Sequence, residues 1–205
     1  MSTELFRLEA AKILEIGGGE DVDELMRLYF SRDRHYHDGN HILYCMKTLE
    51  AIHFPDFNAP AMKMALLYHD AIYTIGKKDN EMRSANLAAQ MFGRTKKYQD
   101  EFRTSVRRLI LATRHLGGLI AHDEQIIADV DLAGLGADWN TFEGNTMQIR
   151  CEWRRVSDSD FRSGRISFFE GMLAREWIYY TQSCRFLFEK RARENMLREI
   201  EEMKC

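Results

Sequence analysis

The sequence is poor in the residues and patterns that mark several classes of protein. Only two prolines occur in 205 residues, and strands have little support. No stretch of about 18 apolar residues is present, and the first residues lack a signal-peptide pattern. The cysteines are too far apart for a Cys-x-x-Cys zinc or redox motif; they are Cys45, Cys151, Cys184 and Cys205. We therefore expect a cytoplasmic protein with free thiols and no membrane segment.

The charge of the chain is close to balanced. The formal net charge is −3, with 45% hydrophobic and 30% charged residues, which is ordinary for a soluble globular protein. Such a balance gives no reason to expect a nucleic acid polymer or an anionic membrane as the partner.

Apolar residues recur at helical spacing through most of the chain. Gly17, Gly18 and Gly19 should end the first helix, and Ser157-x-x-Asp160 is a plausible capping box. The expected helices cover about residues 3–16, 21–30, 41–52, 59–75, 81–92, 98–115, 124–131, 138–155, 158–175 and 183–203. The pattern predicts an all-α fold, a single-domain helical bundle over residues 1–205.

The helix expected from Ala59-Pro60 to Gly76 breaks its apolar pattern with His69 and Asp70. A buried aspartate beside a histidine costs free energy unless another group compensates it. A divalent cation would do so, because a neutral imidazole and a carboxylate are both good ligands. A hydrogen-bonded His–Asp pair, or an aspartate that caps the helix, explains the doublet equally well.

Four motifs occur in a fixed order around this doublet. They are Arg34-x-Tyr36-His37 with His41-Ile42, His69-Asp70 with Tyr73, Asn80-Glu81-x-x-Ser84, and Asp129-x-Asp131-Leu132 with Leu135-Gly136. The ordered set resembles the HD superfamily of metal-dependent phosphohydrolases, and most closely a small branch of predicted hydrolases. Two positions depart from that branch: Trp153 stands where a tyrosine is expected, and Asp38 where an asparagine is expected.

The resemblance implies a helical bundle of the HD-domain type with a metal-site core at about residues 30–136. Helices of about residues 137–203 would pack on that core. The implied metal ligands are His41, His69, Asp70 and Asp129. This mixed nitrogen and oxygen set suits a divalent ion such as Mn, Fe, Co, Ni, Zn or Mg. The implied reaction is hydrolysis of a phosphate ester of a small molecule, with nucleotides among the candidates, by metal-activated water.

Asp129 and Asp131 compete for the last ligand position, and the family pattern favours Asp129. Asp131 would then orient a ligand or cap a helix. Asp70 and Glu81 are the candidate catalytic residues, although a glutamate in the first turn of a helix also complements the helix dipole.

Five further residues are candidates for binding the substrate: Arg34, His37, Lys77, Asn80 and His115. Each has a structural alternative, such as surface solvation for Lys77 and a helix-end position for His115.

Other functions remain open at this point. The chain could be a metal-containing nucleotide-binding or regulatory protein without turnover, a di-iron oxygenase, or a helical interaction protein whose doublet is structural. The aromatic-rich late helices could form a homodimer face or belong to the core.

Overall fold

The computed structural model describes residues 2–15, 19–52, 54, 57–94 and 97–204. Gly17 and Gly18, which were predicted to help end the first helix, and Cys205, which was predicted to be a free thiol, lie outside these residues. Every regular element in the described part of the chain is helical, so the prediction of an all-α fold is confirmed. None of these helices is long and apolar enough to cross a membrane.

The chain divides into two compact units, Met1–Ala128 and Asp129–Cys205. The division falls inside one helix, α7 (His122–Asp131). The short 3₁₀ helix η1 (Leu132–Gly136), at which the metal-site core is expected to end, belongs to the second unit.

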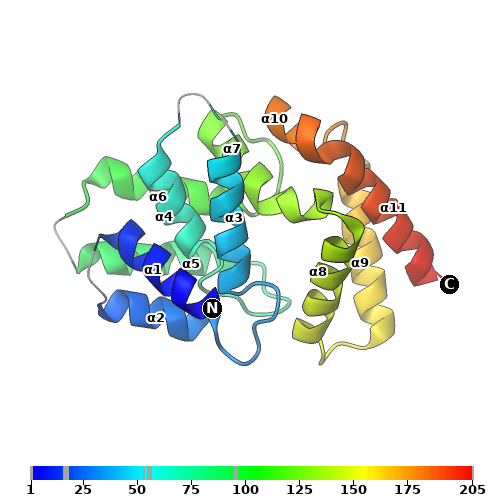
Figure 1. The fold of residues 1–205 in the computed structure, drawn as a ribbon, viewed down its shortest axis with the longest axis horizontal. Helices are drawn as coiled ribbons and strands as arrows, with labels where there is room; N and C mark the ends of the chain where they lie inside the picture. The colour runs from blue at the N-terminus through cyan, green and yellow to red at the C-terminus, as the bar shows by residue number, and fades with distance from the viewer. Residues whose placement is uncertain (1, 16–18, 53, 55–56, 95–96, 205) are drawn as a thin grey trace. The chain divides into compact units, whose positions relative to one another are not determined.

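The first unit is built around a buried helix, α4 (Ala59–Tyr68), which contacts four other helices of this unit (Figure 1). These are α1 (Ser2–Leu14), α3 (Gly39–Ala51), α5 (Asn80–Gly93) and α6 (Asp100–Ala112). A further helix, α2 (Glu20–Tyr29), contacts α1. Seven of the ten residues of α4 are buried, which fits its almost continuous apolar sequence.

Side chains fix the starts of the two helices that lead to the doublet. The carboxylate of Asp38 accepts hydrogen bonds from the backbone N–H groups of Asn40 at 2.7 Å and His41 at 3.3 Å, and so caps α3. Asn58 caps α4 through the N–H of Ala61 at 3.1 Å. Such caps satisfy backbone donors that have no partner inside the helix. His41 therefore lies in the first turn of α3, as expected.

The helix that carries the doublet ends earlier than the sequence suggests. It was expected to continue to Gly76, but α4 ends at Tyr68, and the doublet lies in the turn that follows. The N–H of Ala71 bonds the carbonyl of Tyr68 at 3.0 Å, and the N–H of Ile72 donates to Ser84 Oγ at 3.0 Å. The side chain of a neighbouring helix thus replaces the helical partner of Ile72 and ends the helix.

The second unit contains η1, α8 (Trp139–Glu152), α9 (Asp158–Leu173), α10 (Gln182–Cys184), a π-helical turn η2 (Arg185–Glu189) and α11 (Lys190–Lys204). Helix α11 contacts η1, α9 and η2, while α8 contacts η1 (Figure 1). The hydroxyl of Ser157 accepts a hydrogen bond from the N–H of Asp160 at 3.1 Å, which confirms the predicted cap of α9.

Gly136, the last residue of η1, packs closely against Phe188 of η2. A Cβ at this position would lie 2.6 Å from Phe188 Cβ and 2.8 Å from the Phe188 carbonyl oxygen. We expect Gly136→Ala to lower the free energy of unfolding by at least about 1–3 kcal/mol, because backbone must move to make room. Gly171→Ala, inside α9, is the matched control. Apart from its own helix backbone and chain neighbours, no atom of the described residues lies within 4 Å of the Cβ position, so this change should stabilise the folded protein by about 0.5–1 kcal/mol. Urea unfolding measures both, and equal stability of Gly136→Ala and wild type would contradict this close packing.

Candidate metal site

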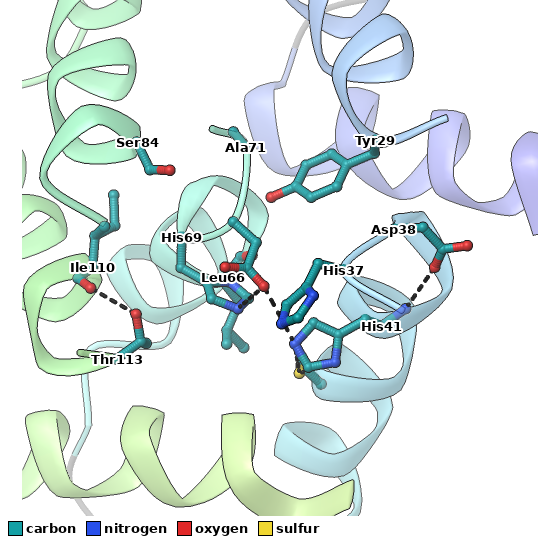
Figure 2. Close-up of polar contacts among 12 residues, drawn as sticks. Tyr29, His37, Asp38, His41, Leu66, His69, Ala71, Ser84, Ile110 and Thr113 are labelled. Carbon is teal, nitrogen blue, oxygen red and sulfur yellow. Dashed lines mark hydrogen bonds and ion pairs between the residues drawn. The ribbon is translucent and has the colours of Figure 1, made fainter. Parts of the chain in front are cut away.

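Three of the predicted ligands come together inside the first unit. His41 Nε2 lies 3.7 Å from Asp70 Oδ2, and His69 Nε2 lies 3.3 Å from the same oxygen. One ligand atom from each residue lies within 4.8 Å of the others. Their exposed fractions are only 7%, 1% and 8% for His41, His69 and Asp70. Figure 2 shows the rings of His41 and His69 on facing elements, α3 and the end of α4.

The hydrogen bond of His69 fixes which of its nitrogens faces the cluster. Its Nδ1 lies 2.9 Å from the carbonyl oxygen of Leu66, which can only accept, so Nδ1 carries the proton. In the neutral ring Nε2 then presents a lone pair toward Asp70 Oδ2. Two acceptors that face each other repel unless a proton or a cation lies between them.

The donor set fits a divalent cation. A neutral imidazole that donates its other N–H to a backbone carbonyl is the usual state of a metal-ligating histidine. Asp70 supplies the negative charge, and the burial of all three side chains makes that charge costly without compensation. Two imidazole nitrogens and a carboxylate suit Mn, Fe, Co, Ni or Zn, and leave positions for further ligands.

A buried thiol lies beside the cluster. Cys45 Sγ is 3.7 Å from Nε2 and 3.9 Å from Nδ1 of His41, one helical turn along α3. No functional role was predicted for Cys45 from the sequence. The i, i+4 spacing of His41 and Cys45 was the available signal, because such residues share a helix face.

Aromatic rings border the cluster. His37 stacks on Tyr73, with ring centroids 4.0 Å apart and an interplanar angle of 20°. Tyr36 lies edge-on to His37 at 4.9 Å and is tilted against His41 at 5.1 Å. Figure 2 shows His37 beside His41, and its stacking on Tyr73 joins the segment that precedes α3 to the segment that follows the doublet.

Tyr29 is a buried neighbour of the doublet that the sequence did not single out as functional. Its hydroxyl donates to the carbonyl of Leu67 at 2.9 Å. Burial, followed by the negative charge of Asp70, holds the pKa of Tyr29 well above its ordinary value. Tyr29 therefore stays a neutral hydrogen-bond donor at the end of α4.

Glu81 and His115 lie within electrostatic range of each other. Burial raises the pKa of the half-buried Glu81; the charge of Asp70 adds to this, while Arg114 and His115 oppose it. His115 has a φ of 54°, in the left-handed region that costs a non-glycine residue about 1–2 kcal/mol. The structure thus places Glu81 within electrostatic range of both Asp70 and His115.

Asn80 and Lys77 belong to the loop between the doublet and α5. The Asn80 side chain accepts from the N–H of Thr74 at 2.9 Å and donates to the carbonyls of Thr74 and Lys77 at 3.0 and 3.3 Å. Asn80 is buried and holds this loop closed, whereas the Lys77 side chain is exposed. The substrate-binding roles of both stay predictions.

Asp129 has a well-defined environment inside the second unit. Its Oδ1 accepts from the N–H of Tyr180, and its Oδ2 accepts from the N–H and the hydroxyl of Thr181, all at 2.7 Å. Burial raises its pKa to about 6, against the opposing effect of these donors. Three of roughly four lone-pair positions of the carboxylate are thus in use. Asp131, the competing candidate, is only partly buried.

Comparison with known proteins gives no match: no family model, no curated protein and no solved structure is significantly similar to this chain.

Proposed function

We propose that the chain is a metal-dependent phosphohydrolase with a helical fold of the HD-domain type. The carrying observation is the buried His41–His69–Asp70 cluster, in which Nε2 of His69 lies 3.3 Å from Oδ2 of Asp70. A divalent cation is the group that best satisfies this arrangement, because it accepts from all three side chains. The HD-type order of motifs adds an aspartate, Asp129 or Asp131, as the last ligand.

A divalent ion held by these residues would lower the pKa of a water molecule and neutralise charge on a phosphoryl group. The chain itself supplies the proton-handling groups. Glu81 is the best placed of them, since burial raises its pKa and brings it closer to the neutral range in which a general base works. His37 and His115 are the candidates for contacts to the substrate. The substrate class that fits is a small phosphorylated molecule.

The test combines metal analysis with a substrate screen. The purified protein should contain close to one transition-metal ion, or take one up after reloading with Mn, Fe, Co, Ni or Zn. The loaded protein should then hydrolyse at least one member of a panel of phosphate monoesters, diesters and pyrophosphates, and a chelator should abolish the activity.

Three outcomes would contradict the proposal. A protein that binds no metal under any loading condition would leave a structural His–Asp pair. Stoichiometric metal and nucleotide binding without hydrolysis would favour the regulatory alternative. Two iron ions with oxygen-dependent chemistry would favour the oxygenase.

A further inference from the structure

Arg34 is bound to backbone on both sides of the cluster. Its Nη1 donates to the carbonyl oxygens of His37 at 2.6 Å and Asp70 at 2.8 Å, and its Nη2 donates to that of Ala71 at 2.8 Å. The guanidinium carbon also lies 5.5 Å from the ring centroids of both Tyr29 and Tyr73. One side chain thus joins the segment before α3 to the doublet turn.

The carbonyl groups at the end of α4 show what this side chain contributes. A helix end leaves its last carbonyls without helical partners. The carbonyl of Leu66 accepts from His69 Nδ1, and that of Leu67 accepts from the hydroxyl of Tyr29. The carbonyl of Tyr68 accepts from the N–H of Ala71, and two carbonyls beyond the helix, those of Asp70 and Ala71, accept from Arg34.

We propose that Arg34 is a positioning residue for the metal site and not a phosphate-binding residue. Its guanidinium holds the backbone of Asp70, so that the carboxylate faces His41 and His69, and it fixes His37 at the same time. This inference rests on the proposed metal site, and it assigns to Arg34 a role different from the substrate contact that the sequence predicted.

The geometry of the guanidinium explains why arginine stands here. Its planar fork presents several N–H donors in fixed directions, which lets it span three carbonyls that belong to two segments. The guanidinium carbon is also within cation–π distance of both tyrosine rings, at 5.5 Å from each centroid. Lysine carries the same charge, but its ammonium group is a compact point charge that cannot reach all three oxygens in this way.

The experiment compares Arg34→Ala and Arg34→Lys with wild type. We expect both variants to bind Co²⁺ about 10–100-fold more weakly, the range for loss of a residue that orients a metal ligand. The visible absorption of bound Co²⁺ should change as well, since Asp70 is no longer held in place. Millimolar guanidinium chloride, which can occupy the space left in Arg34→Ala, should restore affinity and spectrum, whereas urea should not.

Arg83→Ala is the matched control. Arg83 also reaches this loop, but it does so through an exposed hydrogen bond to a side chain, Thr74 Oγ1, at 3.0 Å. Its removal should leave Co²⁺ affinity and spectrum unchanged. Amide hydrogen exchange of the metal-free proteins gives a second readout: the doublet turn should exchange faster in Arg34→Ala than in Arg83→Ala. If Arg34→Ala fails to fold, Arg34→Lys carries the same comparison.

The outcomes separate this inference from the proposed function. Wild type that binds no Co²⁺ would overturn the metal site itself. Wild type that binds Co²⁺, with unchanged affinity and spectrum in Arg34→Ala, would overturn the positioning role alone. Unchanged metal binding with a raised KM for a phosphate ester would identify Arg34 as the phosphate ligand, because positioning loss should instead lower kcat.

Discussion

Asp70→Ala is expected to abolish stoichiometric metal binding while the helical fold stays intact. Asp70 carries the only negative charge among the three residues of the buried cluster, and its Oδ2 faces both imidazole rings. Loss of a residue that only orients a ligand is expected to lower metal affinity about 10–100-fold. Loss of a direct ligand such as Asp70 should lower it by more. Elemental analysis and chelator competition measure the loss, and circular dichroism reports on the fold.

The thermal stability of the variant with and without metal provides an independent check. Added metal should raise the Tm of wild type, because it binds the folded state only, and should leave the Tm of Asp70→Ala unchanged.

Asp79→Ala controls for the loss of a carboxylate in the same region. Asp79 precedes α5, is exposed, and makes no side-chain capping bond. Its variant should retain metal and the metal-dependent rise in Tm. Equal metal content in Asp70→Ala and wild type would show that the doublet is a structural pair.

The helices could be predicted because each needs only local information. Apolar residues at helical spacing and side chains such as Asp38 and Ser157 determine where a helix lies and where it starts. The end of α4 could not be predicted in this way. It depends on Ser84 and Arg34, which lie far from the doublet in sequence and reach it only once the first unit has folded.

The candidate site also has features that the sequence could predict and features that depend on the folded chain. The resemblance of the ordered motifs to the HD superfamily named His41, His69 and Asp70 together, and the three side chains do lie together in the structure. The identity of the protonated nitrogen of His69 could not be read from sequence, because it depends on the carbonyl that the folded helix presents. Arg34 is a further case: a cation in a motif suggests an anionic ligand, and only the folded chain shows that Nη1 and Nη2 donate to backbone carbonyls.

Asp129→Ala should cost about 2–5 kcal/mol of unfolding free energy, the second large effect we expect. The substitution leaves the buried N–H of Thr181 and the partly buried N–H of Tyr180 without their acceptor, and a fully buried group of this kind costs about 1–3 kcal/mol. Asp131→Ala is the matched control on the same helix, and its effect on stability should be smaller because its side chain is only partly buried. Urea unfolding of the metal-free proteins measures the difference.

The pH dependence of this difference has a definite sign. Burial raises the pKa of Asp129 from its ordinary value to about 6, so the folded chain binds this proton more tightly than the unfolded chain does. The contribution of the carboxyl group to stability therefore grows as the pH falls through that value, and is lost as the pH rises. The stability gap between wild type and Asp129→Ala should widen from neutral toward mildly acidic pH.

Metal binding by the same variants decides between the two aspartates. Three hydrogen bonds already occupy most of the lone-pair positions of the Asp129 carboxylate, so folded Asp129→Ala should bind Co²⁺ with the affinity of wild type. A large loss of affinity in Asp129→Ala, measured at a temperature where the variant is folded, would instead support the assignment that the family resemblance favours. The same loss confined to Asp131→Ala would make Asp131 the last ligand and leave Asp129 as the residue that holds Tyr180 and Thr181 in place.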